Sequence, residues 1–224
     1  FIAFADRGEG RTEDGRMGRS NQGKVRKMIR DLSKQNRSYT CFNQSAAVPY
    51  ELLESLVDAA RYAPSCLNIQ PLRYVISCTE RKNQKIFPAI NWNVLLRGYD
   101  GPREGQKPMA YIVLIADKGL MPEDEMMWID IGISAQTMML AAVEQGLGGC
   151  MIANFDKAAL ARELRLEKWY DPVLILALGK PNERIFLDYI SRTDATEFYR
   201  DREGYLHIPK RRLEDVILPF EPKD

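Results

Sequence analysis

The spacing of apolar residues predicts a helix and a strand early in the organised part of the chain. From Val48 to Tyr62 apolar side chains recur at i, i+3, i+4 and i+7, and Pro49 stands near the first turn, both typical of an amphipathic helix. From Leu72 to Cys78 every second residue is apolar, which predicts a strand. A shorter helix is expected to begin at Met28, where the organised sequence starts.

Two uninterrupted apolar runs, Ala110–Ala116 and Pro172–Leu178, predict strands that are buried on both faces. Between them, Met126 to Gln145 is apolar on nearly every side and long enough for a helix. Such a helix is covered either by a large core or by a second subunit, and we expect the subunit interface. The polar residues that interrupt it argue against a membrane span: Asp130, Gln136 and Glu144.

A glycine-rich stretch, Gly146-Leu147-Gly148-Gly149, lies between this helix and a short predicted strand, Cys150 to Ile152. Nucleotide-binding glycine loops have the reverse order, strand first and helix second. The stretch is therefore interpreted as the C-terminal cap of the helix. Asp156 is then expected to cap a following helix that carries Leu160 and Leu164.

The two ends of the chain differ from its middle. Residues 1–27 are charged and without period, and are interpreted as an extension or leader that precedes one domain, residues 28–224. Residues 80–108 predict a helix followed by a long loop, of the kind that often binds ligands or covers a site. After Pro181 the chain turns polar, and an arm of about residues 182–224 is expected to lie on a partner subunit.

The loop between the first amphipathic helix and its strand, residues 63–71, gathers short polar side chains between Pro64 and Pro71. The prolines restrict its backbone, while Ser65, Asn68 and Gln70 offer a hydroxyl and two amides that both donate and accept hydrogen bonds. These groups suit a flat, uncharged heterocycle. The alternative is a turn whose polar residues satisfy their own backbone, and the loop by itself favours this alternative slightly.

Composition narrows the chemistry. The 32 basic and 31 acidic residues nearly cancel, so nucleic acid and anionic membranes are not expected partners. The cysteines lie far apart, which predicts reduced thiols in a cytoplasmic protein. A single histidine, His207, rules out a metal site built from several histidines, and no metal is expected. An enzyme of this composition therefore needs a cofactor to carry the reaction.

Taken in order, four segments resemble motifs of the nitroreductase family of flavin-dependent oxidoreductases. The loop 63–71 matches the pattern A-P-S-x-x-N-x-Q-P and is the most specific of them. The others are Arg37-Ser38-x-x-x-Phe42, the glycine stretch with Cys150, and Pro209-Lys210-Arg211-Arg212-Leu213. Together they cover about residues 28–218.

The resemblance implies an α+β fold of three layers with a central antiparallel sheet flanked by helices. It also implies a domain-swapped homodimer with two FMN sites at the interface. The residues implied in phosphate binding are Arg37, Ser38, Lys210 and Arg212. Those implied beside the flavin ring are Pro64, Ser65, Cys66, Asn68 and Gln70 of the other subunit, and the backbone of Met151, Ile152, Ala153 and Asn154.

Thr40 departs from the family pattern, because members commonly carry Arg or Lys at this place, near the flavin. A cation there favours the anionic reduced flavin, whereas a threonine only forms hydrogen bonds. We therefore expect a lower reduction potential unless Arg103 or Lys107 reaches the ring.

The resulting hypothesis is an oxidoreductase that takes hydride from NADH or NADPH and passes it through FMN to an electron-poor acceptor, nitroaromatic or quinone-like. No side chain is expected to act as a catalytic residue, because the flavin N5 carries the hydride. One alternative keeps the fold and changes the chemistry to reductive dehalogenation or flavin fragmentation. Another is a flavin-binding or redox-sensing protein without efficient turnover.

Overall fold

The computed structural model of the chain describes residues 28–92 and 99–220. Its centre is a four-stranded sheet with the order β1-β2-β4-β3, in which every neighbouring pair is antiparallel. The bounds are β1 Leu72–Ser77, β2 Ala110–Asp117, β3 Gly148–Ile152 and β4 Tyr170–Gly179. The predicted antiparallel sheet is confirmed, and its strands lie where the apolar runs predicted them.

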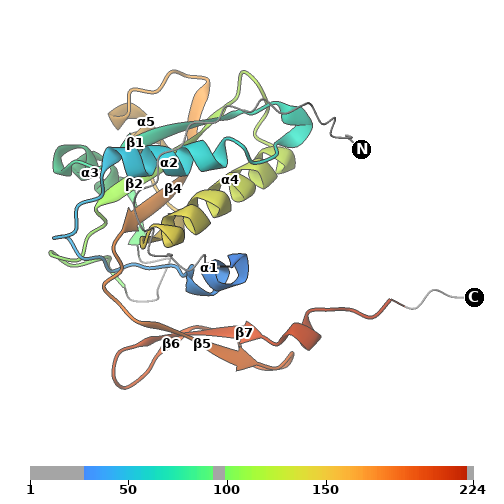
Figure 1. The fold of residues 1–224 in the computed structure, drawn as a ribbon. Helices are drawn as coiled ribbons and strands as arrows, with labels where there is room; N and C mark the ends of the chain where they lie inside the picture. Colours follow the sequence, from blue (N-terminus) through green and yellow to red (C-terminus); the bar gives the residue numbers. More distant parts are fainter. Residues whose placement is uncertain (1–27, 93–98, 221–224) are drawn as a thin grey trace, which may run out of the picture.

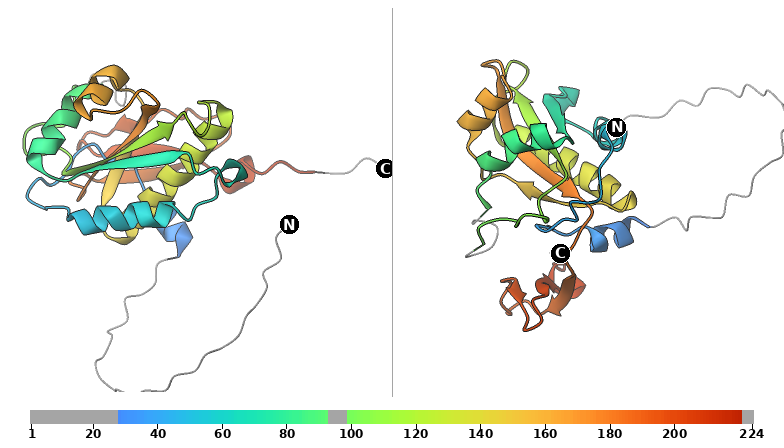
Figure 2. Two further views of the ribbon diagram at one scale, coloured as in Figure 1. Left: turned by 90° about the horizontal axis from the view of Figure 1, so that it is seen from above. Right: turned by 90° about the vertical axis from the view of Figure 1, so that its left-hand side faces the viewer.

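Helices cover both faces of this sheet and give three layers (Figure 1; Figure 2, left). One face carries α2 and α4, and the other carries α3 and α5. Successive residues of β2 alternate between the two cores: Ile112 and Leu114 pack toward α2 and α4, whereas Val113 packs toward α3 and α5. The bounds are α1 Ile29–Gln35, α2 Tyr50–Ala60, α3 Glu80–Ile86, α4 Glu125–Glu144 and α5 Lys157–Glu163.

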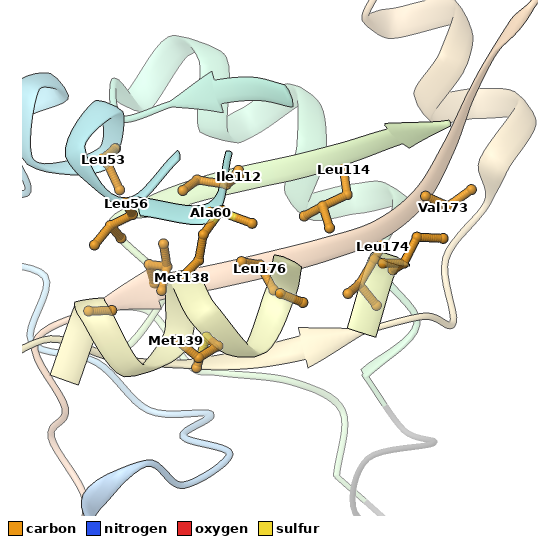
Figure 3. Close-up of a cluster of buried hydrophobic side chains, with 14 of the residues drawn as sticks. Leu53, Leu56, Ala60, Ile112, Leu114, Met138, Met139, Val173, Leu174 and Leu176 are labelled. Carbon is orange, nitrogen blue, oxygen red and sulfur yellow. The ribbon is translucent and has the colours of Figure 1, made fainter. Parts of the chain in front are cut away.

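The larger core lies between the sheet and the pair α2 and α4. Figure 3 shows Leu53 and Leu56 of α2 and Met138 of α4 converging on Ile112 and Leu176 of the sheet. These side chains are at most 1% exposed, so they are fully removed from water. Burying aliphatic side chains of this size contributes about 1.5–3 kcal/mol each, which fixes the position of α4 on the sheet.

α4 is the longest described helix and holds the central place in the fold. Asp124 caps its start, because the side chain accepts the N–H groups of Met126 and Met127. By length and composition alone the helix could cross a membrane, because the mean hydropathy of its most apolar 18 residues is 1.4. Half of this apolar part of the helix is buried inside the protein, as in the core helix of a folded domain. Its other side leaves Trp128 and Ile129 43% and 53% exposed.

The glycine stretch after α4 serves two purposes rather than the single one predicted. Gly146 has φ +78° and ends the helix, as expected of a C-terminal cap. Gly148 and Gly149 are strand residues of β3 and not part of the cap. A Cβ on Gly148 would lie 2.5 Å from Tyr39 Cδ2 and 2.6 Å from Pro181 Cγ, so only glycine lets these segments approach.

The segment after Pro181 forms a second, three-stranded sheet that the sequence pattern did not predict. Its order is β5-β7-β6, with β5 Ile185–Ile190 parallel to β7 Leu206–Arg211, and β6 Tyr199–Arg200 antiparallel to β7. The sheet lies apart from the main body, beyond α1 (Figure 1; Figure 2, right). The strands lack a clear apolar alternation because only Leu206 is fully buried among them. Several apolar side chains that follow are at least 58% exposed: Leu213, Val216, Ile217, Leu218 and Phe220.

The other local predictions have mixed outcomes. Asp156 caps α5 by accepting the N–H of Ala159 at 2.9 Å, as predicted. α2 begins and ends within two residues of its predicted bounds. The helix expected after residue 80 is α3, but part of the loop that follows it lies outside the described residues, as do residues 1–27.

Candidate functional site

A cavity of about 310 Å³ lies between α1, α4, β3 and β7, and we call it the cradle. It brings together Arg37 and Ser38 of the N-terminal motif, Lys210 of the C-terminal motif, and Met151, which directly follows the glycine motif. The remaining lining residues are Ser33, Asn36, Gln136, Met139, Gly149 and Ile208.

Arg37 is the cationic group at the inner side of the cradle. Its Nη2 donates to the backbone oxygen of Ser33 at 2.6 Å, while its Nε is buried and has no hydrogen-bond partner among the described residues. Burial lowers the pKa of the guanidinium, although Tyr39 acts in the opposite direction. A half-buried guanidinium with one donor that lacks an acceptor is suited to binding the oxygens of a phosphate.

The backbone of the same segment is fixed against β3. Ser38 pairs with Gly149 in a parallel bridge, and the N–H of Tyr39 donates to the carbonyl of Gly149 at 3.0 Å. These contacts place the Ser38 side chain at the wall of the cradle, next to Arg37. Because Gly148 has no side chain, Tyr39 can pack closely against β3, and this contact brings the N-terminal motif to the sheet.

The C-terminal motif contributes unequally. Lys210 lies on β7 and lines the cradle. Arg212 follows the strand, is exposed and does not line the cradle, although its N–H donates to the carbonyl of Ile190 at 3.1 Å. Within one chain the structure therefore brings Lys210, but not Arg212, to Arg37.

The loop 63–71 is held by a buried carboxylate of α4. Both oxygens of Asp130 accept the N–H of Cys66, at 2.9 and 3.2 Å, and Asp130 is only 4% exposed. The loop adopts φ values of +49° to +58° at Leu67, Asn68 and Gln70. Non-glycine residues rarely adopt such angles, and a run of them indicates a conformation that the surroundings impose.

The polar side chains of this loop bond to one another. The Ser65 hydroxyl accepts the N–H of Gln70 at 3.1 Å, and the Gln70 amide donates to the side-chain oxygen of Asn68 at 3.2 Å. These are the self-satisfying contacts of a structured turn. Asn68 and Gln70 are nevertheless exposed, so their remaining donors and acceptors face outward.

A second cavity, of about 140 Å³, lies between this loop and α4. Asp130 and Ser134 are at its α4 side, and Ser134 shares a 2.8 Å hydrogen bond with Tyr74. Further lining residues include Arg61, Pro64, Ser65, Gln70 and Arg73.

The two cavities lie on opposite sides of α4. Residues of an α-helix advance by about 100° each, so Asp130 and Ser134 project to one side and Gln136 and Met139 to nearly the opposite side. The helix itself therefore separates the loop 63–71 from the cradle of the same chain.

The remaining candidates lie at the end of β3 and directly after it, apart from Thr40. Met151 is half-buried beside the cradle, whereas Ile152 packs into the smaller core on the other face. Ala153 and Asn154 are exposed, and the Asn154 carbonyl accepts the N–H of Asn91 at 3.1 Å. Thr40 is 3% exposed.

Lys107 is one of the two cations expected to reach the flavin ring near Thr40. Lys107 instead forms a 2.6 Å ion pair with Glu104 and lies 5.2 Å from the centre of the Phe87 ring. The Thr40 backbone and hydroxyl bond to Glu183, as described below.

Sequence reasoning missed several residues of the site. Gln136 and Met139 line the cradle, but on a helix that is apolar all round no pattern shows which side faces a cavity. Asp130 is a carboxylate in the middle of an apolar helix, which is a sequence signal for a buried hydrogen-bond partner. Glu183 lies in a polar stretch, and no feature of the sequence distinguishes it from the other acidic residues there.

Comparison with known proteins identifies the family. The sequence profile described as the nitroreductase family matches residues 34–180, and the chain therefore belongs to that family of oxidoreductases. The resemblance drawn from the four motifs is thus confirmed.

Individual relatives are distant. The Bacillus subtilis protein YdgI, provisionally named an NAD(P)H nitroreductase, is 22% identical over 71% of this chain and 91% of its own length. A nitroreductase family protein from Clostridium difficile 630 is 27% identical, with a TM-score of 0.57 over 70% of this chain and 86% of that chain. An FMN-dependent nitroreductase from Clostridium difficile R20291 shares the fold at 22% identity, with a TM-score of 0.56 over 68% and 87% of the two chains.

Proposed function

We propose that this protein is an FMN-dependent oxidoreductase that takes hydride from NADH or NADPH and reduces an electron-poor small molecule, nitroaromatic or quinone-like. The observation that carries the proposal is the cradle, where the buried Nε of Arg37 lacks a partner in the described part of the chain and Lys210 lines the same cavity. The family, and the names of relatives that include FMN and NAD(P)H, support the same function.

The chemistry of the residues that line the cradle supports FMN as the cofactor. The Arg37 guanidinium, the Ser38 hydroxyl and the Lys210 ammonium would hold its phosphate, with Arg212 contributing from the segment after β7. The backbone from Met151 to Asn154 would line one side of the flavin ring, at the end of β3. A buried donor without an acceptor is costly, so an anion bound by the guanidinium of Arg37 would offset part of that cost.

The proposed site needs two subunits. The loop 63–71 and the cradle of one chain lie on opposite sides of α4, so a single flavin would take its ring contacts from Pro64, Ser65, Cys66, Asn68 and Gln70 of a partner. The exposed apolar surface of α4, with Trp128 and Ile129, and the exposed apolar segment 213–220 would be covered by that partner. We therefore propose a homodimer with FMN sites at its interface.

Bound FMN supplies the hydride chemistry, and the protein supplies binding, orientation and a water-poor surface. The hydroxyl of Ser65 and the amides of Asn68 and Gln70 do not titrate near neutral pH, so they would orient the ring rather than transfer protons. His207 bonds to two aspartates of the C-terminal sheet and is not part of the cradle lining. We expect the protein to act in the cytoplasm, without nucleic acid or membrane partners.

The proposal is tested on the purified protein. We expect a yellow protein that releases FMN on denaturation, and that oxidises NADH or NADPH faster when a quinone or nitroaromatic compound is present. A protein that neither retains nor rebinds FMN would contradict the proposal. FMN binding without NAD(P)H oxidation would instead favour the flavin-binding protein without turnover.

A further inference from the structure

Glu183 is a buried carboxylate in the connection between the two sheets, after β4 and before β5. Its side chain is 9% exposed. One oxygen, Oε1, accepts the N–H of Thr40 at 2.6 Å, the N–H of Cys41 at 3.0 Å and the hydroxyl of Thr40 at 3.3 Å. A carboxylate that accepts consecutive backbone N–H groups fixes the course of that backbone.

The backbone on either side of these contacts is paired as well. The N–H of Asn182 donates to the carbonyl of Cys41 at 3.0 Å, and Phe42 pairs with Pro181 in an antiparallel bridge. The segment that begins with Arg37 and Ser38 is therefore tied to the connection directly before the C-terminal sheet.

The other oxygen of Glu183 points toward the C-terminal sheet. Oε2 is buried and forms no hydrogen bond with the described residues, but Arg200 Nη2 of β6 lies 3.6 Å away. Arg200 also donates to the carbonyl of Gly204 at 2.8 Å, which holds it to the turn before β7. The carboxylate thus contacts the N-terminal segment with one oxygen and attracts the C-terminal sheet with the other.

This arrangement matters because the cradle is assembled from the same two parts. Arg37 and Ser38 come from the N-terminal segment, three and two residues before Thr40, whereas Lys210 comes from β7. The C-terminal sheet lies apart from the main body (Figure 1), and the connection that contains Glu183 joins the two, so contacts of that connection bear on where Lys210 stands relative to Arg37.

We infer that Glu183 is a positioning residue that sets the two halves of the phosphate cradle against each other. The inference rests on the proposed function, since it concerns the affinity for the phosphate of FMN. Glu183 does not line the cradle, so it acts through Arg37, Ser38 and Lys210 rather than by touching the ligand.

The experiment compares FMN with riboflavin, which has the same ring and ribityl chain but no phosphate. For Glu183→Ala we expect FMN affinity to fall about tenfold, or about 1.4 kcal/mol, with riboflavin affinity changed less than about threefold. Hydrogen exchange of the Thr40 and Cys41 amides should accelerate by about tenfold or more in the same variant. Glu203→Ala removes an exposed acid beside the same connection and serves as the matched control, with neither effect.

The outcomes separate the two claims. An equal loss of FMN and riboflavin affinity, or no loss of either, would overturn the positioning role while FMN binding by the parent protein stands. A parent protein that does not prefer FMN over riboflavin would overturn the proposed function, and this inference with it. If Glu183→Ala does not fold, Glu183→Gln keeps an acceptor for both amides but loses the attraction to Arg200. It should lower the preference for FMN about threefold, and an unchanged preference contradicts the inference.

Discussion

Asp130 accepts the backbone N–H of Cys66 with both carboxylate oxygens, at 2.9 and 3.2 Å. The contact joins the middle of α4 to the loop 63–71, across 64 positions of sequence. Because Asp130 is only 4% exposed, little water reaches its carboxylate, and the hydrogen bond to Cys66 replaces that water. The position of the loop, and of every side chain that it presents, therefore depends on this helix.

Removing that carboxylate should loosen the loop. Asp130→Ala leaves the Cys66 amide without its acceptor, which we expect to lower the free energy of unfolding by about 1–3 kcal/mol. Asp130→Asn keeps one acceptor oxygen, so it should lower the free energy of unfolding by less than Asp130→Ala does. Urea unfolding measures both, with Glu144→Ala, an exposed acid on the same helix, as the control. A loss no larger than that of Glu144→Ala would show that the contact does not hold the loop.

Asn68 tests what the loop does. Asn68 has φ +58° and its side-chain oxygen accepts a hydrogen bond from Gln70, so Asn68→Ala is expected to lower the melting temperature somewhat whatever the loop binds. If it contacts the flavin of the partner, FMN binding should weaken by about 1 kcal/mol or more, while the pH dependence of hydride transfer stays nearly unchanged. Glu54→Ala, on α2 before the loop, is the matched surface control. If Asn68→Ala keeps its FMN affinity but has a lower melting temperature, the loop has a purely structural role.

The phosphate end is tested by Lys210→Ala and Arg212→Ala. Lys210→Ala should weaken FMN binding by about 1.5–3 kcal/mol, the range for losing a charge-assisted hydrogen bond. Arg212→Ala should weaken it by less, because Arg212 does not line the cradle of the same chain. Arg202→Ala removes an exposed cation from the same C-terminal segment and should have no such effect. Equilibrium titration with FMN gives the affinities. Unchanged binding in both variants would mean that this basic pair is a solvated surface patch.

His207 makes the C-terminal sheet sensitive to pH. Its Nε2 lies 3.1 Å from Asp201 Oδ2 and its Nδ1 lies 2.9 Å from Asp188 Oδ2, so the protonated ring donates to both carboxylates. The hydrogen bond to Asp201, together with that to Asp188, raises the pKa of His207 above its usual value despite partial desolvation. A raised pKa contributes stability that is complete below about pH 6.5 and is lost as the pH rises through the raised value.

The measurement is an NMR titration of the ring, made simple by the single histidine of the chain. We expect a pKa above about 6.5 in the folded protein, and a lower one in Asp201→Asn. A folded-state pKa at or below that value would contradict the charged bridge between β7 and the two aspartates.

The sequence predicted the main sheet and its helices because their signals are strong and local. The run from Ala110 to Ala116 has no polar residue, and α2 has a clear helical period, so neither depends on distant contacts. The C-terminal sheet escaped prediction because its strands bury few side chains fully, Leu206 being the exception, and pair in part in parallel. No period-2 pattern marks such strands.

The candidate site was predictable in its motifs but not in its assembly. Residue types indicated that Arg37 and Lys210 suit phosphate and that Asn68 and Gln70 suit a heterocycle. Which side of α4 each group occupies depends on how the helix is rotated on the sheet, and an apolar helix carries no sign of that rotation. The role of Glu183 depends on backbone contacts 143 positions apart, which a single sequence does not record.

The central claim is that each flavin site combines the cradle of one subunit with the loop 63–71 of the other, and subunit mixing tests it most directly. Arg37→Ala and Asn68→Ala homodimers, each impaired in FMN binding, are unfolded together and refolded as heterodimers, which are isolated by different affinity tags. A shared site predicts that one of the two sites in each heterodimer carries both substitutions and the other carries none, so one FMN per heterodimer binds with parental affinity. If each site instead belongs to a single chain, every site retains one substitution and no parental affinity returns, which would contradict the account.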